Sequence, residues 1–226
     1  MTLRPAGDRR VTRTEWLDSR HSFGYGPHVE PGNTHFGLLL VNNEDRLAAG
    51  AGFDDHPHRE VEVVTWVLAG SLAHSDSAGH TGTARPGIVQ RMSAGAGVRH
   101  AEHAGPEPAH YVQMWLWPGE PGGAPAYDTV DVRAGLAAGE LVSVPPLRQP
   151  AATLHAARLP PGRSVRLPAA AYLHVFVARG TVRVAGVGRL GAGDAARLTG
   201  TGAVDLTGVA AAEVLAWQMR AGLPAG

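Results

Sequence analysis

Two histidines separated by one proline, His56 and His58, begin a group of residues that could hold a metal ion. Residues i and i+2 of a β-strand point to the same face, so these imidazoles would project together. A second pair with this spacing, His100 and Glu102, follows downstream, after two glycines. If a β-barrel brings the two strands together, three imidazoles and one carboxylate converge. This donor set suits Fe(II), Mn(II), Ni(II), Cu(II) or Zn(II).

The donor set also bears on the kind of site. A single histidine pair on a strand is typical of a half-exposed surface, whereas two pairs in an apolar β context favour a metal centre. A six-coordinate ion bound by these four ligands keeps open positions for water, substrate or dioxygen. Zinc with four such ligands would be saturated. A six-coordinate ion is therefore favoured over zinc. Fe(II) is the expected ion, with Mn, Ni, Cu, Co and Zn as alternatives.

Three further residues are assigned to the surroundings of this centre. Gln113 either faces the cavity as a hydrogen-bond donor to substrate or is a buried amide bonded to the backbone. Glu62 is interpreted as a partner that orients the imidazoles and fixes their tautomers. Arg59 either guards the entrance or forms a surface pair with Glu60 or Asp55.

The elements that position these residues are predicted to be short strands. The chain of 226 residues contains 30 glycines and 17 prolines, and its apolar runs are cut at close intervals by Pro-Gly pairs. This pattern is typical of an all-β sandwich or barrel. Residues 130–141 are the best candidate for a short helix. Residues 119–127 resemble a linker, which predicts domains at 1–127 and 128–226.

The two halves of the chain echo each other. VLAGS at 67–71 recurs as VARGT at 177–181, and the segment at 85–95 recurs loosely at 190–200. The offsets, 110 and 105 residues, are nearly equal. Either a β unit has been duplicated, or glycine-rich strands are similar by chance. Ten of the twelve histidines precede residue 111, so a duplicate would have kept imidazoles only in its first copy.

Composition excludes several classes of function. Lys+Arg and Asp+Glu are both 20, so the chain lacks the basic excess expected of a protein that binds nucleic acid directly. Cysteine is absent, which excludes disulfides and thiolate zinc sites. No segment has the apolar core of a signal peptide or the length of a membrane span. The expectation is a cytoplasmic protein with no membrane partner.

A family resemblance rests on these same residues. The segment HPHREVEVVTWVLAGSLAHSDSAGHTGTARPGIVQRMSAGAGVRHAEH, residues 56–103, resembles the pirin signature. WLDSRHSFGYG at 16–26 is similar to the opening of the shorter bacterial pirins, and YVQMWLWP at 111–118 to the strand that closes their first barrel. The resemblance is strong through residue 127 and vague beyond it.

The resemblance implies an all-β bicupin, two packed antiparallel barrels of the jelly-roll or cupin type, with one metal in the N-terminal barrel. Carried over by motif, the metal ligands are His56, His58, His100 and Glu102. The C-terminal barrel would be a degenerate copy without ligands. Pirins more often read HPHRGFE, so Glu60 is a departure that could alter charge or access beside the ligands.

The function implied is a metal-dependent dioxygenase of the quercetin 2,3-dioxygenase type. Such an enzyme opens the ring of a flavonol and releases carbon monoxide, and Glu102 would act as the general base. The alternative implied is a non-catalytic, redox-sensing regulator that acts through protein partners. A monomer is expected in either case.

The resemblance also bears on His74, Asp76 and His80, which could suggest a second metal site. Their segment corresponds to a strand-and-loop connection, which favours local hydrogen bonding. On this interpretation, a His74→Ala variant keeps its metal.

Overall fold

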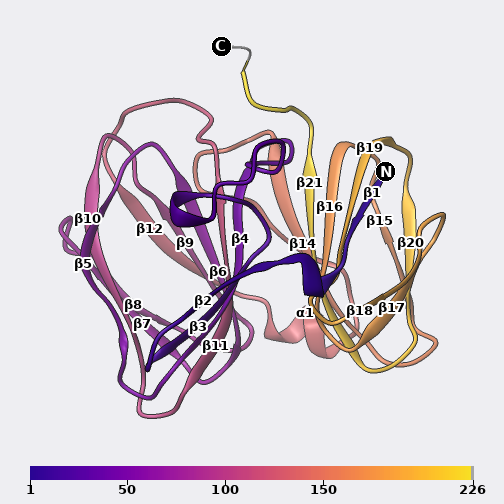
Figure 1. The fold of residues 1–226 in the computed structure, drawn as a ribbon, viewed down its shortest axis with the longest axis horizontal. Helices are drawn as coiled ribbons and strands as arrows, with labels where there is room; N and C mark the ends of the chain where they lie inside the picture. The colour runs from indigo at the N-terminus through magenta and orange to yellow at the C-terminus, as the bar shows by residue number, and fades with distance from the viewer. Residues whose placement is uncertain (225–226) are drawn as a thin grey trace.

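The protein folds as two β-barrels side by side, seen in a computed structural model that describes residues 1–224 (Figure 1). The strands of the first barrel are β2 (Arg10–Arg13), β3 (Leu17–His21), β4 (Leu39–Leu47), β5 (Gly52–His58), β6 (Glu62–Ala69), β7 (Leu72–Asp76), β8 (Thr81–Ala84), β9 (Ile88–Ser93), β10 (Val98–Ala104), β11 (Ala109–Leu116) and β12 (Ala126–Asp131). They form a seven-stranded sheet, β12-β9-β6-β11-β4-β3-β2, and a four-stranded sheet, β5-β10-β7-β8.

The second barrel is built in the same way. Its strands are β1 (Thr2–Arg4), β13 (Val142–Val144), β14 (Ala152–Leu159), β15 (Ser164–Leu167), β16 (Ala170–Arg179), β17 (Thr181–Val184), β18 (Gly188–Gly191), β19 (Ala195–Thr201), β20 (Val204–Gly208) and β21 (Ala212–Met219). They form a six-stranded sheet, β1-β19-β16-β21-β14-β13, and a four-stranded sheet, β15-β20-β17-β18. The predicted all-β bicupin is therefore confirmed.

The strand order shows that the two barrels are copies of one unit. Adding ten to the strand numbers in β9-β6-β11-β4 gives β19-β16-β21-β14, and β5-β10-β7-β8 likewise becomes β15-β20-β17-β18. The sequence echo falls at equivalent turns, between β6 and β7 in the first barrel and between β16 and β17 in the second. Both turns contain a glycine with positive φ, Gly70 at +68° and Gly180 at +71°. This agreement favours duplication over chance similarity.

A few short helical segments lie outside the sheets. The predicted helix is present as α1 (Arg133–Ala137), and two 3-10 turns, η1 (Ala6–Asp8) and η2 (Gly26–His28), lie near the N-terminus. No helix among residues 1–224 is long and apolar enough to cross a bilayer. The boundary expected after Tyr127 falls inside β12, which pairs with β9 of the first barrel along its whole length.

Side chains of the two large sheets meet in a shared core between the barrels. Alternate residues of each strand face this core, as expected for a sheet buried on both sides. The first barrel contributes Val64, Trp66, Leu68, Val112, Met114 and Leu116, and the second contributes Leu154, Ala156, Phe176, Leu215, Trp217 and Met219. The shared core holds the barrels in one arrangement.

The barrel interiors differ sharply. The second is filled by apolar side chains, among them Leu173, Val175, Val177, Val182 and Leu206. The first has apolar ends but buries polar side chains between them, including Thr65, His74, Gln90, His100 and Glu102. Buried polar groups are retained where they are hydrogen-bonded or bind a ligand. The polar interior therefore indicates that the functional site lies in the first barrel.

Candidate metal centre

The antiparallel pairing of β5 with β10 brings the predicted histidines together. His100 lies opposite His56 in the register, and His58 lies two residues along β5 on the same face. The ring centroids of His56, His58 and His100 are 4.4 to 4.9 Å apart. One ligand nitrogen from each falls within 4.8 Å of the other two, so the three imidazoles form one cluster.

Glu102 lies beside this cluster and joins it through His100. Its carboxylate, with ligand atoms of His74 and His100, forms a second grouping within 4.8 Å. The register between β5 and β10 shifts between His100 and Glu102, an irregularity that re-aims side chains in strands near sites. Both residues are 1% exposed, so both point into the barrel.

Two amides hold the Glu102 carboxylate in place. Gln90 Nε2 donates to Oε1 at 2.8 Å, and Gln113 Nε2 donates to Oε2 at 2.7 Å. Gln113 Oε1 in turn accepts from Trp115 Nε1 at 3.0 Å. The amide of Gln113 therefore does not bond the backbone, as one alternative expected. It bonds and positions the Glu102 carboxylate instead of being reserved for substrate.

A hydrogen-bonded chain behind His100 fixes its tautomer. Asp76 Oδ2 accepts from His74 Nε2 at 3.2 Å, and His74 Nδ1 lies 3.3 Å from His100 Nδ1. Because His74 donates through Nε2, its Nδ1 is the acceptor and His100 donates through Nδ1. The lone pair of His100 Nε2 is then directed away from His74, and this buried nitrogen has no hydrogen-bond partner among the described residues.

His56 is oriented in the same sense. Its Nδ1 donates to the carbonyl oxygen of Asp54 at 2.8 Å, which leaves the lone pair on Nε2, 3.1 Å from His58 Nε2. Metal-bound histidines usually donate their other ring nitrogen to a carbonyl or carboxylate in this way. An unpartnered buried nitrogen facing two more imidazoles fits a divalent transition metal, which these donors would coordinate.

Burial keeps two of the imidazoles, those of His58 and His100, neutral. It lowers the pKa of His58 to about 4, and the neighbouring charges of His100 and His56 add to the effect. It lowers the pKa of His100 to about 3, helped by the charges of His56 and His74. Both rings are therefore unprotonated at neutral pH, which is the form that binds a metal.

Aromatic rings line the mouth of the cluster. Trp115 packs edge-on against His58 with centroids 4.8 Å apart, and Tyr25 lies 6.1 Å from Trp115. Phe53 is 6.1 Å from His56 on another side. Aromatic rings packed beside the imidazole cluster suit a planar aromatic substrate.

Two residues predicted to surround the site act elsewhere. Glu62 was expected to orient an imidazole, but its Oε2 accepts the backbone N–H of Arg148 at 2.9 Å, and this expectation is wrong. Successive residues of a strand point to opposite faces of the sheet. Val63 and Thr65 face the interior of the first barrel, so Glu62 faces the other side of the sheet. Arg59 is exposed and pairs at 4.0 Å with Glu60, as the surface-pair interpretation predicted.

Glu60 itself turns away from the histidines. Its carboxylate accepts the backbone N–H of Gly122 at 3.0 Å, so it ties down the segment before β12. Among non-glycine residues of the described chain, Glu60 alone has a positive φ, +52°. This left-handed conformation favours glycine, the residue that the resemblance leads one to expect at this position.

Sequence reasoning missed two contributors. His74 bonds Asp76 as predicted, and His80 Nδ1 also lies 3.0 Å from Asp76, but the contact of His74 with His100 was not foreseen. Gln90 was not singled out at all. The sequence signal for Gln90 was an amide beside Val89 in a strand segment, 88–93, where a buried polar side chain needs a hydrogen-bond partner.

The second barrel offers no matching cluster. Both groupings of three or more potential ligands found in residues 1–224 lie in the first barrel. Arg166, which stands in the strand equivalent to β5, is opposite Asp205, and both side chains are more than half exposed.

Two family models match the chain. The model described as "Pirin" matches residues 5–116, and the model described as "Quercetinase C-terminal cupin domain" matches residues 147–219. The two matches cover the two barrels in turn.

Individual relatives agree with these matches. A Mycobacterium tuberculosis protein named "Putative quercetin 2,3-dioxygenase" is 47% identical over 233 aligned positions, which cover 98% of this chain and 96% of that protein. An Escherichia coli protein named "Quercetin 2,3-dioxygenase" is 40% identical over 128 positions, 56% of this chain and 55% of that protein. The crystal structure of the E. coli bacterial pirin YhhW with nickel(II) superposes with a TM-score of 0.84 at 29% identity, covering 97% of this chain and 99% of that one.

Proposed function

Because the chain belongs to the pirin family, we propose that its first barrel binds one divalent transition metal and opens the ring of a flavonol with dioxygen. The ligands proposed are His56, His58, His100 and Glu102. Fe(II) is the ion proposed, since a six-coordinate ion leaves positions open beside these donors. The reaction adds dioxygen across the heterocycle and releases carbon monoxide.

One observation supports this proposal above the others. His100 Nε2 is a buried nitrogen with no hydrogen-bond partner among the described residues, and it belongs to a cluster of three imidazoles. Leaving a buried polar atom unpaired costs about 1 to 3 kcal/mol, so such an atom usually has a partner. A metal ion satisfies this nitrogen and both neighbouring imidazoles at once.

The remaining residues supply orientation and proton transfer. When bound, the metal supplies a Lewis acid that lowers the pKa of the flavonol hydroxyl. Glu102 accepts the hydroxyl proton on a carboxylate oxygen, and the amides of Gln90 and Gln113 keep that carboxylate fixed. The rings of Trp115 and Tyr25, which lie in turn beside His58, supply apolar surface against which the flavonol rings would pack.

Metal analysis of protein purified without a tag tests the ligand set. We expect about one ion per chain in the parent protein, and loss of the ion in His56→Ala and Glu102→Ala. His155→Ala is the matched control, because His155 bonds Ser143 and Gln218 in the second barrel. Retention of metal by both site variants would refute the assignment.

Substrate assays test the reaction. Anaerobic addition of quercetin should shift the flavonol absorbance only when the protein is metal-loaded, and admitting oxygen should release carbon monoxide. Full metal loading without shift or gas would remove the flavonol dioxygenase proposal while leaving the metal site intact.

A further inference from the structure

A cavity lies between the barrels, and none of the clustered imidazoles lines it. Its volume is about 610 Å³, and it is lined by both barrels and by α1. Cavities of roughly 300 to 1,000 Å³ at domain interfaces are the usual sites for small molecules. Its apolar wall is formed by Leu68, Pro86, Leu136, Leu159, Pro160 and Pro161.

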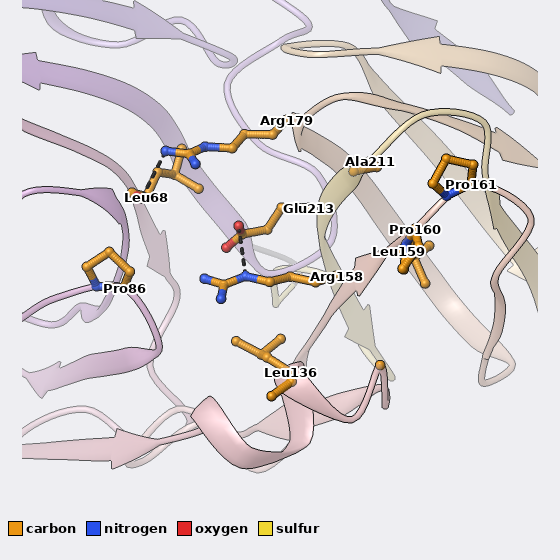
Figure 2. A pocket seen from close by; sticks show the side chains of 13 residues that line it. Leu68, Pro86, Leu136, Arg158, Leu159, Pro160, Pro161, Arg179, Ala211 and Glu213 are labelled. Carbon is orange, nitrogen blue, oxygen red and sulfur yellow. Dashed lines mark hydrogen bonds and ion pairs between the residues drawn. The ribbon is translucent and has the colours of Figure 1, made fainter.

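Three charged side chains lie in this wall. Figure 2 shows Arg158 and Arg179 reaching from the second barrel toward the first, with Glu213 between them. Glu213 is 5% exposed and both its oxygens are already used. Oε1 accepts from Trp66 Nε1 at 2.6 Å, and Oε2 accepts from Arg158 Nε at 3.1 Å.

Arg158 bonds Glu213 through Nε alone, which leaves its two terminal amino groups free to bind a ligand. Figure 2 shows these two groups extending past Glu213 toward Pro86. Arg179 donates through one terminal nitrogen to the carbonyl oxygen of Leu68 at 2.9 Å, which fixes its guanidinium over the cavity. Two guanidinium groups and one carboxylate leave the wall with one unneutralised positive charge.

We propose that this inter-barrel cavity binds a small aromatic carboxylate. A guanidinium presents paired N–H donors whose geometry matches the two oxygens of a carboxylate. The single excess charge of the wall matches a monoanion, and its leucine and proline side chains match an apolar body. The inference does not depend on the proposed dioxygenase function, because none of the lining residues belongs to the imidazole cluster.

Binding of 2-naphthoate to the full chain, measured by calorimetry, tests the proposal. We expect saturable binding at one site, with 2-naphthamide, the uncharged analogue, bound roughly 10- to 100-fold more weakly. Inorganic phosphate should not compete, since it lacks the apolar body. Equal affinity for the acid and the amide, or displacement by phosphate, would overturn the assignment.

Two variants locate the site. Arg179→Gln should weaken naphthoate binding by roughly tenfold or more, and Arg158→Lys should also weaken it, because lysine keeps the charge beside Glu213 but loses the fork. Arg183→Gln removes an exposed arginine from β17 and is the matched control. Unchanged affinity in Arg179→Gln and Arg158→Lys, with both proteins folded by circular dichroism, would place the ligand elsewhere.

A variant of the imidazole cluster distinguishes binding in this cavity from binding at the proposed metal centre. Naphthoate should bind His56→Ala as well as it binds the parent protein. Loss of binding in that variant would show that the acid occupies the imidazole site instead, which overturns the cavity proposal without touching the proposed reaction.

Discussion

His74 connects a buried carboxylate to a proposed metal ligand. Its ring lies between Asp76 and His100, is almost wholly buried, and stacks on Tyr127 with centroids 4.3 Å apart. Each contact restricts the ring, and together they decide which nitrogen of His100 keeps its lone pair. Mutation of such partners of metal ligands typically lowers metal affinity by roughly 10- to 100-fold.

We therefore expect His74→Ala to weaken metal binding by about 10- to 100-fold. The variant removes the acceptor for His100 Nδ1, so the ring is no longer held with Nε2 toward the metal. Competition with a chromogenic chelator measures the affinity. This replaces the expectation, drawn from the sequence, that His74→Ala keeps its metal.

His80→Ala is the control for that experiment. His80 contacts the same Asp76 carboxylate but does not reach His100, so metal affinity should stay close to that of the parent protein. If His74→Ala and His80→Ala bind metal equally well, the orienting role of His74 is excluded.

At this scale the sequence predicted the clustered histidines but not their supports. The i, i+2 spacing of His56 and His58 follows from strand geometry alone. The contact of His74 with His100 depends on the register between β7 and β10, which no local pattern specifies. The contact between His74 and His100 could not be predicted because the register between distant strands cannot be read from local sequence.

The turn between β16 and β17 shows why each barrel needs glycine at one place. Gly180 has a φ of +71°, and a Cβ added there would overlap the carbonyl oxygen of Ala211. Gly70 at the equivalent turn would meet the carbonyl oxygen of Pro108. The close approach of backbone to backbone, as well as the left-handed conformation, excludes a side chain.

A pair of glycine variants separates these two causes. Gly162 also has a positive φ, +79°, but nothing lies within 4 Å of its added Cβ, so Gly162→Ala should cost only about 1 kcal/mol. Gly180→Ala should cost roughly 2 to 4 kcal/mol, because the overlap adds to the backbone strain. Urea unfolding of both variants measures the difference, and equal losses would show that the overlap relaxes freely.

At the scale of elements, strands and turns were predictable from glycine and proline spacing, and the short helix was found where expected. The conformation of Glu60 was not predictable, since a glutamate with positive φ contradicts its own preference. Its hydrogen bond to Gly122, more than sixty residues away in sequence, offsets that strain.

A buried histidine lies in the packing between the barrels. His174 is 0% exposed, its two ring nitrogens have no hydrogen-bond partners among the described residues, and Phe23 and Phe36 pack near its ring. Burial lowers its pKa to about 3, and the charge of Arg197 adds to the effect. The folded protein therefore keeps this ring neutral at pH values where the unfolded chain protonates it.

This difference makes stability depend on pH in one direction. Below the ordinary histidine pKa of about 6.5, the unfolded state binds a proton that the folded state cannot, so stability falls as pH decreases toward 3. At pH 5 the loss from this one ring is about 2 kcal/mol. His174→Phe should remove that share of the acid-side loss, measured by urea unfolding of metal-free protein at pH 7 and pH 5.

The matched control is His35→Phe, a change at an exposed position. It should leave the difference in unfolding free energy between the two pH values as it is in the parent protein. An unchanged difference in His174→Phe would mean that the ring is already protonated in the fold.

At the scale of the molecule, the sequence offered duplication as one of two alternatives, but it did not predict that the N-terminal strand joins the second barrel. β1 pairs with β19 of the second barrel, although it lies at the other end of the chain, and β12 stays with the first. Pairing over such separations leaves no local trace in composition. The predicted first domain, residues 1–127, therefore included β1, a strand that pairs within the sheet of the second barrel.

That edge strand bears on biosynthesis. Thr2 pairs with Arg197, so β1 emerges from the ribosome long before the strand that completes its hydrogen bonds exists. Until then its amides and carbonyls are satisfied only by water, while the first barrel already has all its strands. The second barrel can gain this outermost strand only after β19 has been made, so a strand made before the whole first barrel settles after it.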